Sequence, residues 1–199
     1  MTFVRWLHQL WSSKLRPAFS LPRPCDWGAL AIAVGAYAAI AVPIGFSTGI
    51  LKRKVADLPA WRIAAGSAAA LVVPCFVEEL VFRVLLLPTP AYLQQVAERL
   101  SQNSSGARGY LVLIGGAAII VNTAIFVAMH PLNAVLLRPE ARRVFLNVWF
   151  LVLCGVLGVT AGTLYLLSGR VWGPTLLHWF VVFPWLFFLG GYAKLRGEE

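Results

Sequence analysis

Two adjacent glutamates lie inside an apolar stretch, and no other feature constrains the chain as strongly. The run from about Trp61 to Leu87 contains Glu78 and Glu79, whereas the other six of the eight acidic residues lie in polar connections or near the ends of the chain. An ionised carboxylate at mid-membrane costs roughly 2.5–3.5 kcal/mol even on lenient insertion scales. Such a pair predicts a functional site, and the alternative is an ion cluster that only packs helices together.

Helix geometry separates the two glutamates. At about 100° per residue, Arg83 lies about 40° round the helix from Glu79 and about 140° from Glu78. Glu79 and Arg83 are therefore expected to form an i,i+4 ion pair in the favoured order, acid before base. Glu78 keeps no local partner, which suits it to act as a general base or ligand while Glu79 orients the site.

The composition excludes a soluble globular domain. Of the 199 residues 59% are hydrophobic and 13% charged, and the apolar runs exceed the roughly 20 residues that a spanning helix needs. We predict an all-α, multi-pass transmembrane bundle of about five spans in the inner or plasma membrane of the cell. The net charge of +9 is scattered over the connections, which favours membrane lipids with anionic headgroups as partners and not nucleic acid.

The chain divides into four parts. The expected segments are an N-terminal interfacial amphipathic segment at 1–26, a first span with a basic loop at 27–60, an intramembrane core at 61–190 and a polar tail at 191–199. The spans are expected at about 27–51, 61–87, 110–130, 144–167 and 171–190. Pro74 is expected to widen the second span locally. Gly158 and Gly162 have the small-xxx-small spacing that lets a neighbouring helix approach closely. The three cysteines have no zinc spacing and are interpreted as small core residues.

Two histidines, His130 and His178, lie in spans separate from the glutamates. Peptide hydrolysis needs an activated water, an acid for the leaving amine and stabilisation of the oxyanion. Glu78 is the candidate to take the proton from water. His130 and His178 either bind a divalent metal such as zinc together with Glu78 or act as hydrogen-bond donors without a metal.

The order of these residues resembles a known family. Its elements are Glu78-Glu79-x-x-x-Arg83, then Phe126-x-x-x-His130 continuing into Pro131-Leu132-Asn133, then a third motif that begins at His178. Each element falls in its own apolar span. The pattern is similar to that of the CAAX-protease and bacteriocin-processing (CPBP, or Abi) family of intramembrane proteases.

The resemblance implies a role for each motif residue. Glu78 would activate water, and Glu79 with Arg83 would support it. His130 would act on the same water or ligate a metal, and His178 would serve the oxyanion or the metal. Phe126 and Asn133 belong to the second motif as supporting residues. The implied substrate is a peptide or a membrane-anchored protein.

One position departs from the family pattern. The third motif usually has Asn or Asp four residues after its histidine, and this chain has Val182. Losing one oxyanion donor costs on the order of 10²–10³ in rate, unless Asn122 or Asn133 substitutes from another helix. Three hypotheses follow: an active intramembrane endopeptidase, an impaired member that serves as a membrane scaffold or binding protein, and a proton-coupled carrier that uses Glu78 and the histidines as a relay. Short loops and the lack of internal repeats count against the carrier.

Overall fold

The computed structural model describes residues 3–101 and 104–197. For residues 104 and 105 it describes the backbone only. These ranges contain helices and connections and no β-strand, apart from one isolated bridge between Lys54 and Leu189. The longer helices are α3 (Pro24–Ser47), α4 (Ala60–Ala70), α6 (Pro90–Leu100), α7 (Ser104–Leu136), α9 (Val148–Ser168) and α10 (Trp172–Phe188). The shorter ones are α1 (Phe3–Leu10), η1 (Trp11–Leu15), α2 (Arg16–Ala18), η2 (Leu71–Phe76), α5 (Val77–Glu79), η3 (Leu80–Leu86), η4 (Pro139–Ala141), α8 (Arg142–Phe145) and α11 (Gly191–Leu195).

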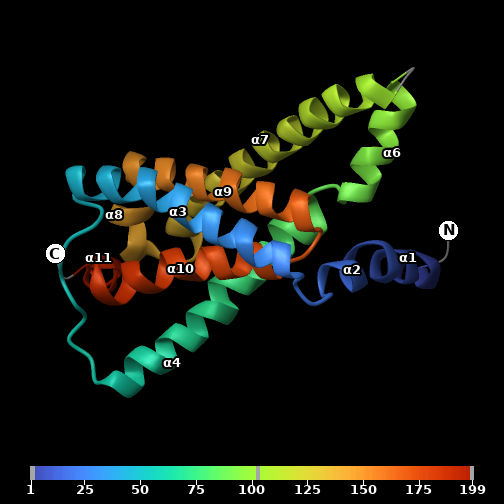
Figure 1. Ribbon diagram of the computed structural model, residues 1–199. Coiled ribbons are helices and arrows are strands. Elements are labelled where there is room, and N and C mark those ends of the chain that lie inside the picture. Colours follow the sequence, from blue (N-terminus) through green and yellow to red (C-terminus); the bar gives the residue numbers. More distant parts are fainter. Residues whose placement is uncertain (1–2, 102–103, 198–199) are drawn as a thin grey trace.

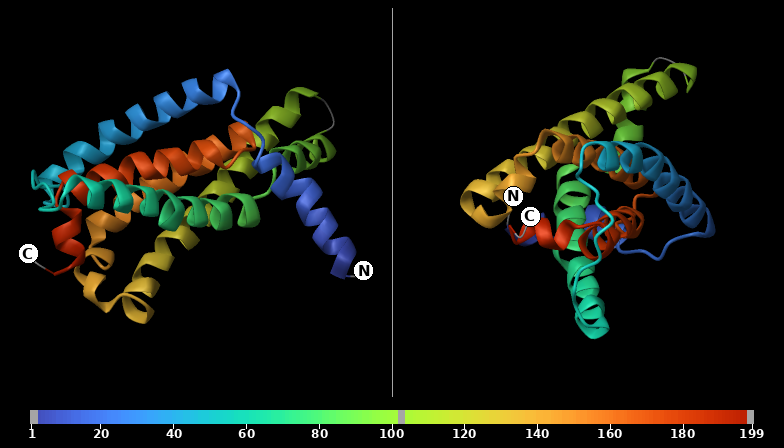
Figure 2. Two further views of the ribbon diagram at one scale, coloured as in Figure 1. Left: turned by 90° about the horizontal axis from the view of Figure 1, so that it is seen from below. Right: turned by 90° about the vertical axis from the view of Figure 1, so that its left-hand side faces the viewer.

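The long helices form an antiparallel bundle (Figure 2). Helix α9 contacts α3, α7 and α10, and α10 also contacts α3, α4 and η2. Successive long segments run in alternating directions, so the N- and C-termini lie at opposite ends (Figure 1). Within the described ranges, α3, α7 and α9 are long and apolar enough to cross a membrane, and α10 is a shorter apolar helix. The molecule is an all-α membrane helix bundle.

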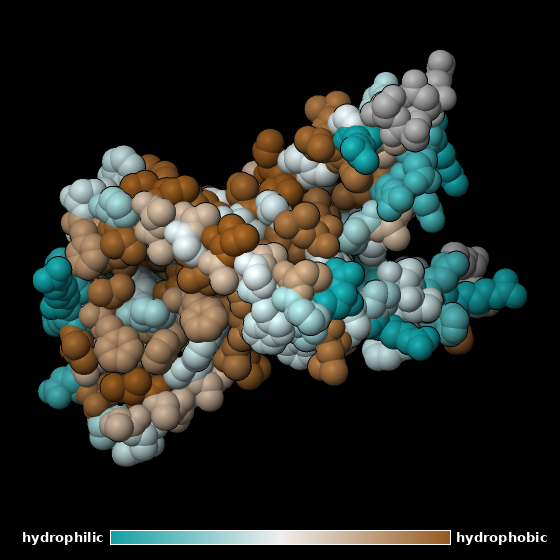
Figure 3. Space-filling model, in the orientation of Figure 1, coloured by the Kyte–Doolittle hydropathy of each residue, from teal (hydrophilic) through white to brown (hydrophobic). Residues whose placement is uncertain are grey.

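The surface agrees with this arrangement. Figure 3 shows hydrophobic residues over the middle of the visible face, and hydrophilic residues gathered around α1 and α2 at one end and at the connection after α3 at the other. An apolar band between two polar ends is what a bundle embedded in a bilayer presents to its surroundings.

The second apolar stretch is broken immediately before the glutamates. Val73 has extended backbone angles (φ −131°, ψ 116°) between α4 and the turns that carry Glu78 and Glu79. The cause is Pro74, whose ring disfavours the helical conformation of the preceding residue and which has no N–H to donate. The expected local widening is confirmed, because η2 and η3 are π-helical turns. The acidic pair therefore starts from a break and not from the middle of a straight helix.

Helices α7 and α9 pack closely because α9 has glycine where they cross. A Cβ atom built on Gly158 would lie 2.8 Å from Cγ2 of Thr123, and one on Gly162 would lie 3.3 Å from Cγ2 of Ile119. The predicted small-xxx-small contact is therefore confirmed. It holds against α9 the part of α7 that carries the second motif.

Several helix boundaries differ from the sequence expectation, and two of them bear on the site. The fourth apolar segment begins at Val148 and not at Val144, because the side chain of Asn147 accepts hydrogen bonds from the N–H groups of Trp149 and Phe150 and caps α9. Helix α7 continues past Pro131 to Leu136. The second motif therefore lies on one continuous helix.

The N-terminal segment projects from one end of the bundle (Figure 1). Helix α1 buries none of its residues, and Phe3, Trp6 and Leu7 stay exposed. The ammonium group of Lys14 in η1 attaches the segment to the end of η3, because it donates to the carbonyl oxygens of Leu85 (2.8 Å) and Leu87 (3.2 Å). Partial burial lowers the pKa of Lys14. An interfacial position for α1 stays a prediction.

Candidate active site

Glu79 lies at the centre of a buried ionic network. Its Oε2 accepts from Nε of Arg83 at 2.7 Å, which confirms the predicted i,i+4 pair. Its Oε1 lies 3.0 Å from Nδ1 of His178 on α10. Glu79 and Arg83 are 0% exposed, so each charge depends on the other for compensation. Glu79 therefore links the first motif to the third.

Asn122 completes this network from α7. Nη1 of Arg83 donates to Oδ1 of Asn122, and Nδ2 of Asn122 donates to the carbonyl oxygen of Phe82 at 2.7 Å. The sequence left open whether Asn122 or Asn133 replaces the amide missing at position 182. In the structure Asn122 is bound to Arg83 and Phe82 and is not among the residues that line the cavity, which disfavours it for that role.

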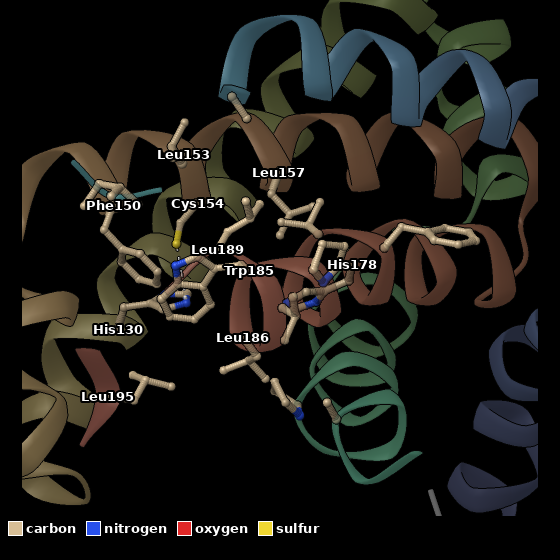
Figure 4. Close-up of a pocket in the computed structure, with 18 of the residues that line it drawn as sticks. His130, Phe150, Leu153, Cys154, Leu157, His178, Trp185, Leu186, Leu189 and Leu195 are labelled. Carbon is tan, nitrogen blue, oxygen red and sulfur yellow. Dashed lines mark hydrogen bonds between the residues drawn. The ribbon is translucent and has the colours of Figure 1, made fainter. Parts of the chain in front are cut away.

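Glu78 has a different environment. It lines a cavity of about 760 Å³ together with His130 of α7 and His178 of α10. Its carboxylate forms no hydrogen bond with any residue that the structure describes. Figure 4 shows His130 and His178 at two places along the cavity wall, with aliphatic and aromatic side chains around them. The structure thus brings three of the predicted site residues, from three separate segments, to one space.

Phe126 connects the two histidines. Its ring is 1% exposed and makes edge-to-face contacts with the rings of His130 (centroids 5.0 Å apart) and His178 (6.1 Å). The guanidinium of Arg83 lies 5.1 Å from its centroid. The second-motif phenylalanine therefore holds the cavity side and the ionic side of the site together.

Hydrogen bonding defines the tautomer of each histidine. Nδ1 of His130 lies 3.0 Å from the carbonyl oxygen of Phe126, and a carbonyl oxygen only accepts, so Nδ1 donates and Nε2 carries the lone pair. Nδ1 of His178 donates to the carboxylate of Glu79 in the same way. Nε2 of His178 has no hydrogen-bond partner among the described residues, whereas Nε2 of His130 accepts from the thiol of Cys154 at 3.6 Å, a weak bond that a water in the cavity would replace.

Cys154 of α9 lies against this histidine. Its Sγ is 3.6 Å from Nε2 of His130, and it lines the cavity. The sequence interpretation assigned all three cysteines to the core: Cys75 and Cys154 are buried, but Cys25 is exposed at the start of α3, so the interpretation is wrong for Cys25. The contact of Cys154 with His130 was missed because no spacing motif connects positions on two different helices.

Val182 and Asn133 also line the cavity. The departure from the family pattern is therefore located at the site itself, where valine offers no donor. Asn133 is the second-motif amide that does face this space. Arg138 lines the cavity as well and is close enough to Glu78 for their charges to attract.

The donor set does not form a ready-made metal centre. Within the described residues, no three His, Cys, Asp or Glu side chains lie together closely enough to hold a metal ion. Glu78, His130 and His178, the ligands expected for zinc, share the cavity without clustering around one point.

A serine motif in the sequence carries no nucleophile. Residues 45–49 read Gly-Phe-Ser-Thr-Gly and match the GxSxG pattern. In the structure Ser47 is the last residue of α3, and its hydroxyl donates to the carbonyl oxygen of Ile44. No histidine among the described residues contacts it, so the motif lacks the strand-to-helix turn and the base that a serine hydrolase needs.

The fold and the site define an all-α integral membrane protein in which carboxylates and histidines from separate helices meet inside the bundle. Residues 59–183 match the family model described as type II CAAX prenyl endopeptidase Rce1-like, and the chain belongs to this family. The family is one of CAAX-type intramembrane endopeptidases, which implies a membrane-anchored peptide or protein as substrate. No curated protein and no solved structure is similar enough to the chain to count as a match.

Proposed function

We propose that this protein is a multi-pass endopeptidase of the inner or plasma membrane that hydrolyses a peptide or membrane-anchored protein, with Glu78 activating water. One observation carries the proposal: Glu78, His130 and His178 line a single cavity inside an apolar bundle. A volume of about 760 Å³ falls in the range of small-molecule and peptide side-chain sites, roughly 300–1,000 Å³.

The proposed chemistry begins with a water held between Glu78 and Nε2 of His130. Glu78 takes a proton from this water, the oxygen attacks the carbonyl carbon, and the same proton passes to the amine nitrogen as the C–N bond breaks. General acid–base catalysis of this kind contributes about 10²–10⁴ in rate. A carboxylate with no hydrogen-bond partner in the cavity is available for this transfer, whereas Glu79 is not.

His178 stabilises the negative charge that develops on the carbonyl oxygen. When the ring of His178 holds a proton on both nitrogens, its Nε2–H donates to the oxyanion, and the Glu79 carboxylate 3.0 Å from Nδ1 stabilises the positive charge. Arg83 and Asn122 hold Glu79 in place. Glu79, Arg83 and Asn122 are thus positioning residues, and His178 is the group that touches the substrate.

If a divalent metal such as zinc binds, Glu78, His130 and His178 are the residues that would hold it, which requires them to move closer together than in this structure; the metal would supply Lewis-acid chemistry at the carbonyl. None of the steps above passes through it. The same three residues therefore account for hydrolysis by acid–base chemistry alone.

The lining of the cavity indicates the kind of substrate. Apart from the site residues it consists mainly of aliphatic and aromatic side chains, among them Phe150, Leu157 and Trp185. Such a wall favours an apolar peptide segment or a lipid-modified side chain next to the cleaved bond. Membrane lipids surround the bundle, and no nucleic acid takes part.

The alternative is an impaired family member that binds a membrane protein without cleaving it. The observation that favours it is Val182, which faces the cavity where the family pattern has Asn or Asp. This alternative predicts that the cavity binds but releases no fragments.

The test compares peptides released from membranes of cells that make the wild type or the Glu78→Gln variant, by mass spectrometry. Glutamine keeps the size of the side chain and cannot take a proton from water, so fragments are expected only with Glu78. Glu98→Gln is the matched control, because Glu98 on α6 is exposed and, among the described residues, bonds only to Gln94. Equal fragment profiles from the wild type and a folded, equally abundant Glu78→Gln protein would contradict the proposal and favour the scaffold.

A further inference from the structure

The cavity lacks one hydrogen-bond donor that peptide hydrolysis uses. Val182 lies on the lining and has no polar atom. The Nδ1–H groups of both histidines are occupied, by the Phe126 carbonyl oxygen and by Glu79. Asn122 is bound to Arg83 and Phe82. His178 is then the one motif residue left to donate to a substrate carbonyl oxygen, and any second donor comes from elsewhere on the lining, where Asn133, Arg138 and Trp185 also carry N–H groups.

Helix α3 supplies a candidate. Tyr37 lines the cavity, and its side chain is 8% exposed. Its hydroxyl forms no hydrogen bond with any described residue. The hydroxyl oxygen is also not completely buried. The exposed part of the residue therefore includes the hydroxyl oxygen, and the space that it meets is the cavity. A phenol O–H in an apolar cavity without a partner is an unused donor.

The position of Tyr37 relative to the site supports a role in catalysis. Tyr37 and Cys154 belong to the same buried cluster and both line the cavity, and Sγ of Cys154 is 3.6 Å from Nε2 of His130. Glu78 lies on the lining of the same cavity. Tyr37, Cys154, Glu78 and His130 therefore all line one cavity. A carbonyl attacked by a water held between Glu78 and His130 would lie within that cavity.

We propose that Tyr37 is a further catalytic residue, whose hydroxyl donates a hydrogen bond to the carbonyl oxygen of the cleaved bond and so replaces the donor that Val182 lacks. The inference rests on the proposed function. Tyr37 contributes no bond making or breaking: its O–H stays intact and stabilises charge that develops on the carbonyl oxygen when water adds. Tyr37 also lies outside residues 59–183, the range that matches the family.

Tyrosine suits this role in an apolar cavity. Its ring packs on α9 and adjoining side chains as part of the main buried cluster, so the hydroxyl is held by a rigid body with few rotamers. A donor fixed before the reaction needs no reorganisation in the transition state and acts strongly where water is excluded. Asn133 also offers an amide donor on the lining. It lies about one turn from the C-terminal end of α7, beyond His130 along the helix.

The test uses the full chain purified in detergent and a synthetic peptide that spans a cleavage site found in the Glu78 comparison. Tyr37→Phe removes only the hydroxyl. It is expected to lower kcat by about 10²–10³ with KM changed by no more than a few-fold, because the bond strengthens in the transition state. Tyr165→Phe is the matched control: Tyr165 is 1% exposed, packs in a different cluster and does not line the cavity. It is expected to keep kcat.

A double variant distinguishes a donor from a packing role. Val182→Asn restores an amide on the same cavity wall, so Tyr37→Phe in the Val182→Asn background is expected to lose much less than Tyr37→Phe alone. An unchanged kcat in Tyr37→Phe would overturn the inference and leave the proposed function standing. A loss of kcat that follows the loss of thermal stability, and that Val182→Asn does not relieve, would also overturn it. A wild type that cleaves nothing in either assay overturns the proposed function and this inference with it.

Discussion

Glu78 and Glu79 are neighbours in the chain, yet they lie in two different environments. Glu79 is 0% exposed and uses both carboxylate oxygens, one for Arg83 and one for His178. Glu78 faces the cavity and bonds to none of the described residues. Glu79 is therefore a structural charge that holds neighbouring helices together, and Glu78 is a charge available for reaction.

This comparison explains how a membrane protein keeps a reactive carboxylate among apolar helices. Three helical segments meet at the ionic network, because Arg83, Asn122 and His178 come from η3, α7 and α10. The network places the histidine of the third motif beside the cavity. The stability of the site is supplied by the buried side, so the cavity side is left with unsatisfied groups that a substrate can use.

The largest effect on stability is expected at Glu79. Glu79→Gln leaves the Arg83 guanidinium buried without its counter-charge, which costs about 3–5 kcal/mol in free energy of unfolding. Glu78→Gln is expected to leave this free energy unchanged or raised, because it removes a carboxylate that has no hydrogen-bond partner. Thermal unfolding of the two purified variants in the same detergent measures the difference. Equal losses of unfolding free energy in both variants would mean that both carboxylates have a structural role, and would contradict the proposed difference between Glu78 and Glu79.

A smaller effect is expected at Asn122. Asn122→Leu leaves Nη1 of Arg83 and the carbonyl oxygen of Phe82 without their partner, at a cost of about 1–3 kcal/mol. Asn133→Leu is the matched change on the same helix, where the side chain lines the cavity. Its stability is expected to stay within about 0.5 kcal/mol of the wild type. Denaturant unfolding followed by tryptophan fluorescence tests this, and a reversed order would place the structural amide at Asn133.

The smallest effect concerns the crossing that holds Asn122 in place. Gly158→Ala puts a methyl group 2.8 Å from Thr123, the residue after Asn122, and the overpacking outweighs the gain in helix propensity by about 1 kcal/mol. At Gly155 the nearest atom to an added Cβ is 3.9 Å away, on Val127, so Gly155→Ala is expected to be neutral or stabilising. The two melting temperatures should move in opposite directions. A parallel shift would show that α7 moves freely against α9 and does not position the network.

Several parts of the site follow from the sequence. The Glu79–Arg83 pair depends only on the i,i+4 spacing of one helix, and the structure has it. The all-α membrane class follows from long apolar runs, since a chain in lipid must satisfy its backbone within helices or closed barrels. The order of the three motifs was enough to indicate the family that the match over 59–183 shows.

Other parts were decided by the tertiary structure. The contacts of Asn122 with Arg83, of Cys154 with His130 and of His178 with Glu79 join positions 39, 24 and 99 residues apart. Helical periodicity shows which residues share a face, but it does not say which face of one helix meets which face of another. The bundle sets that rotation through the break at Val73 and the close approach at Gly158. For this reason the sequence determined which residues are chemically able to act, and only the packing of the helices determined that Asn122 supports Arg83 while Tyr37 and Val182 face the cavity.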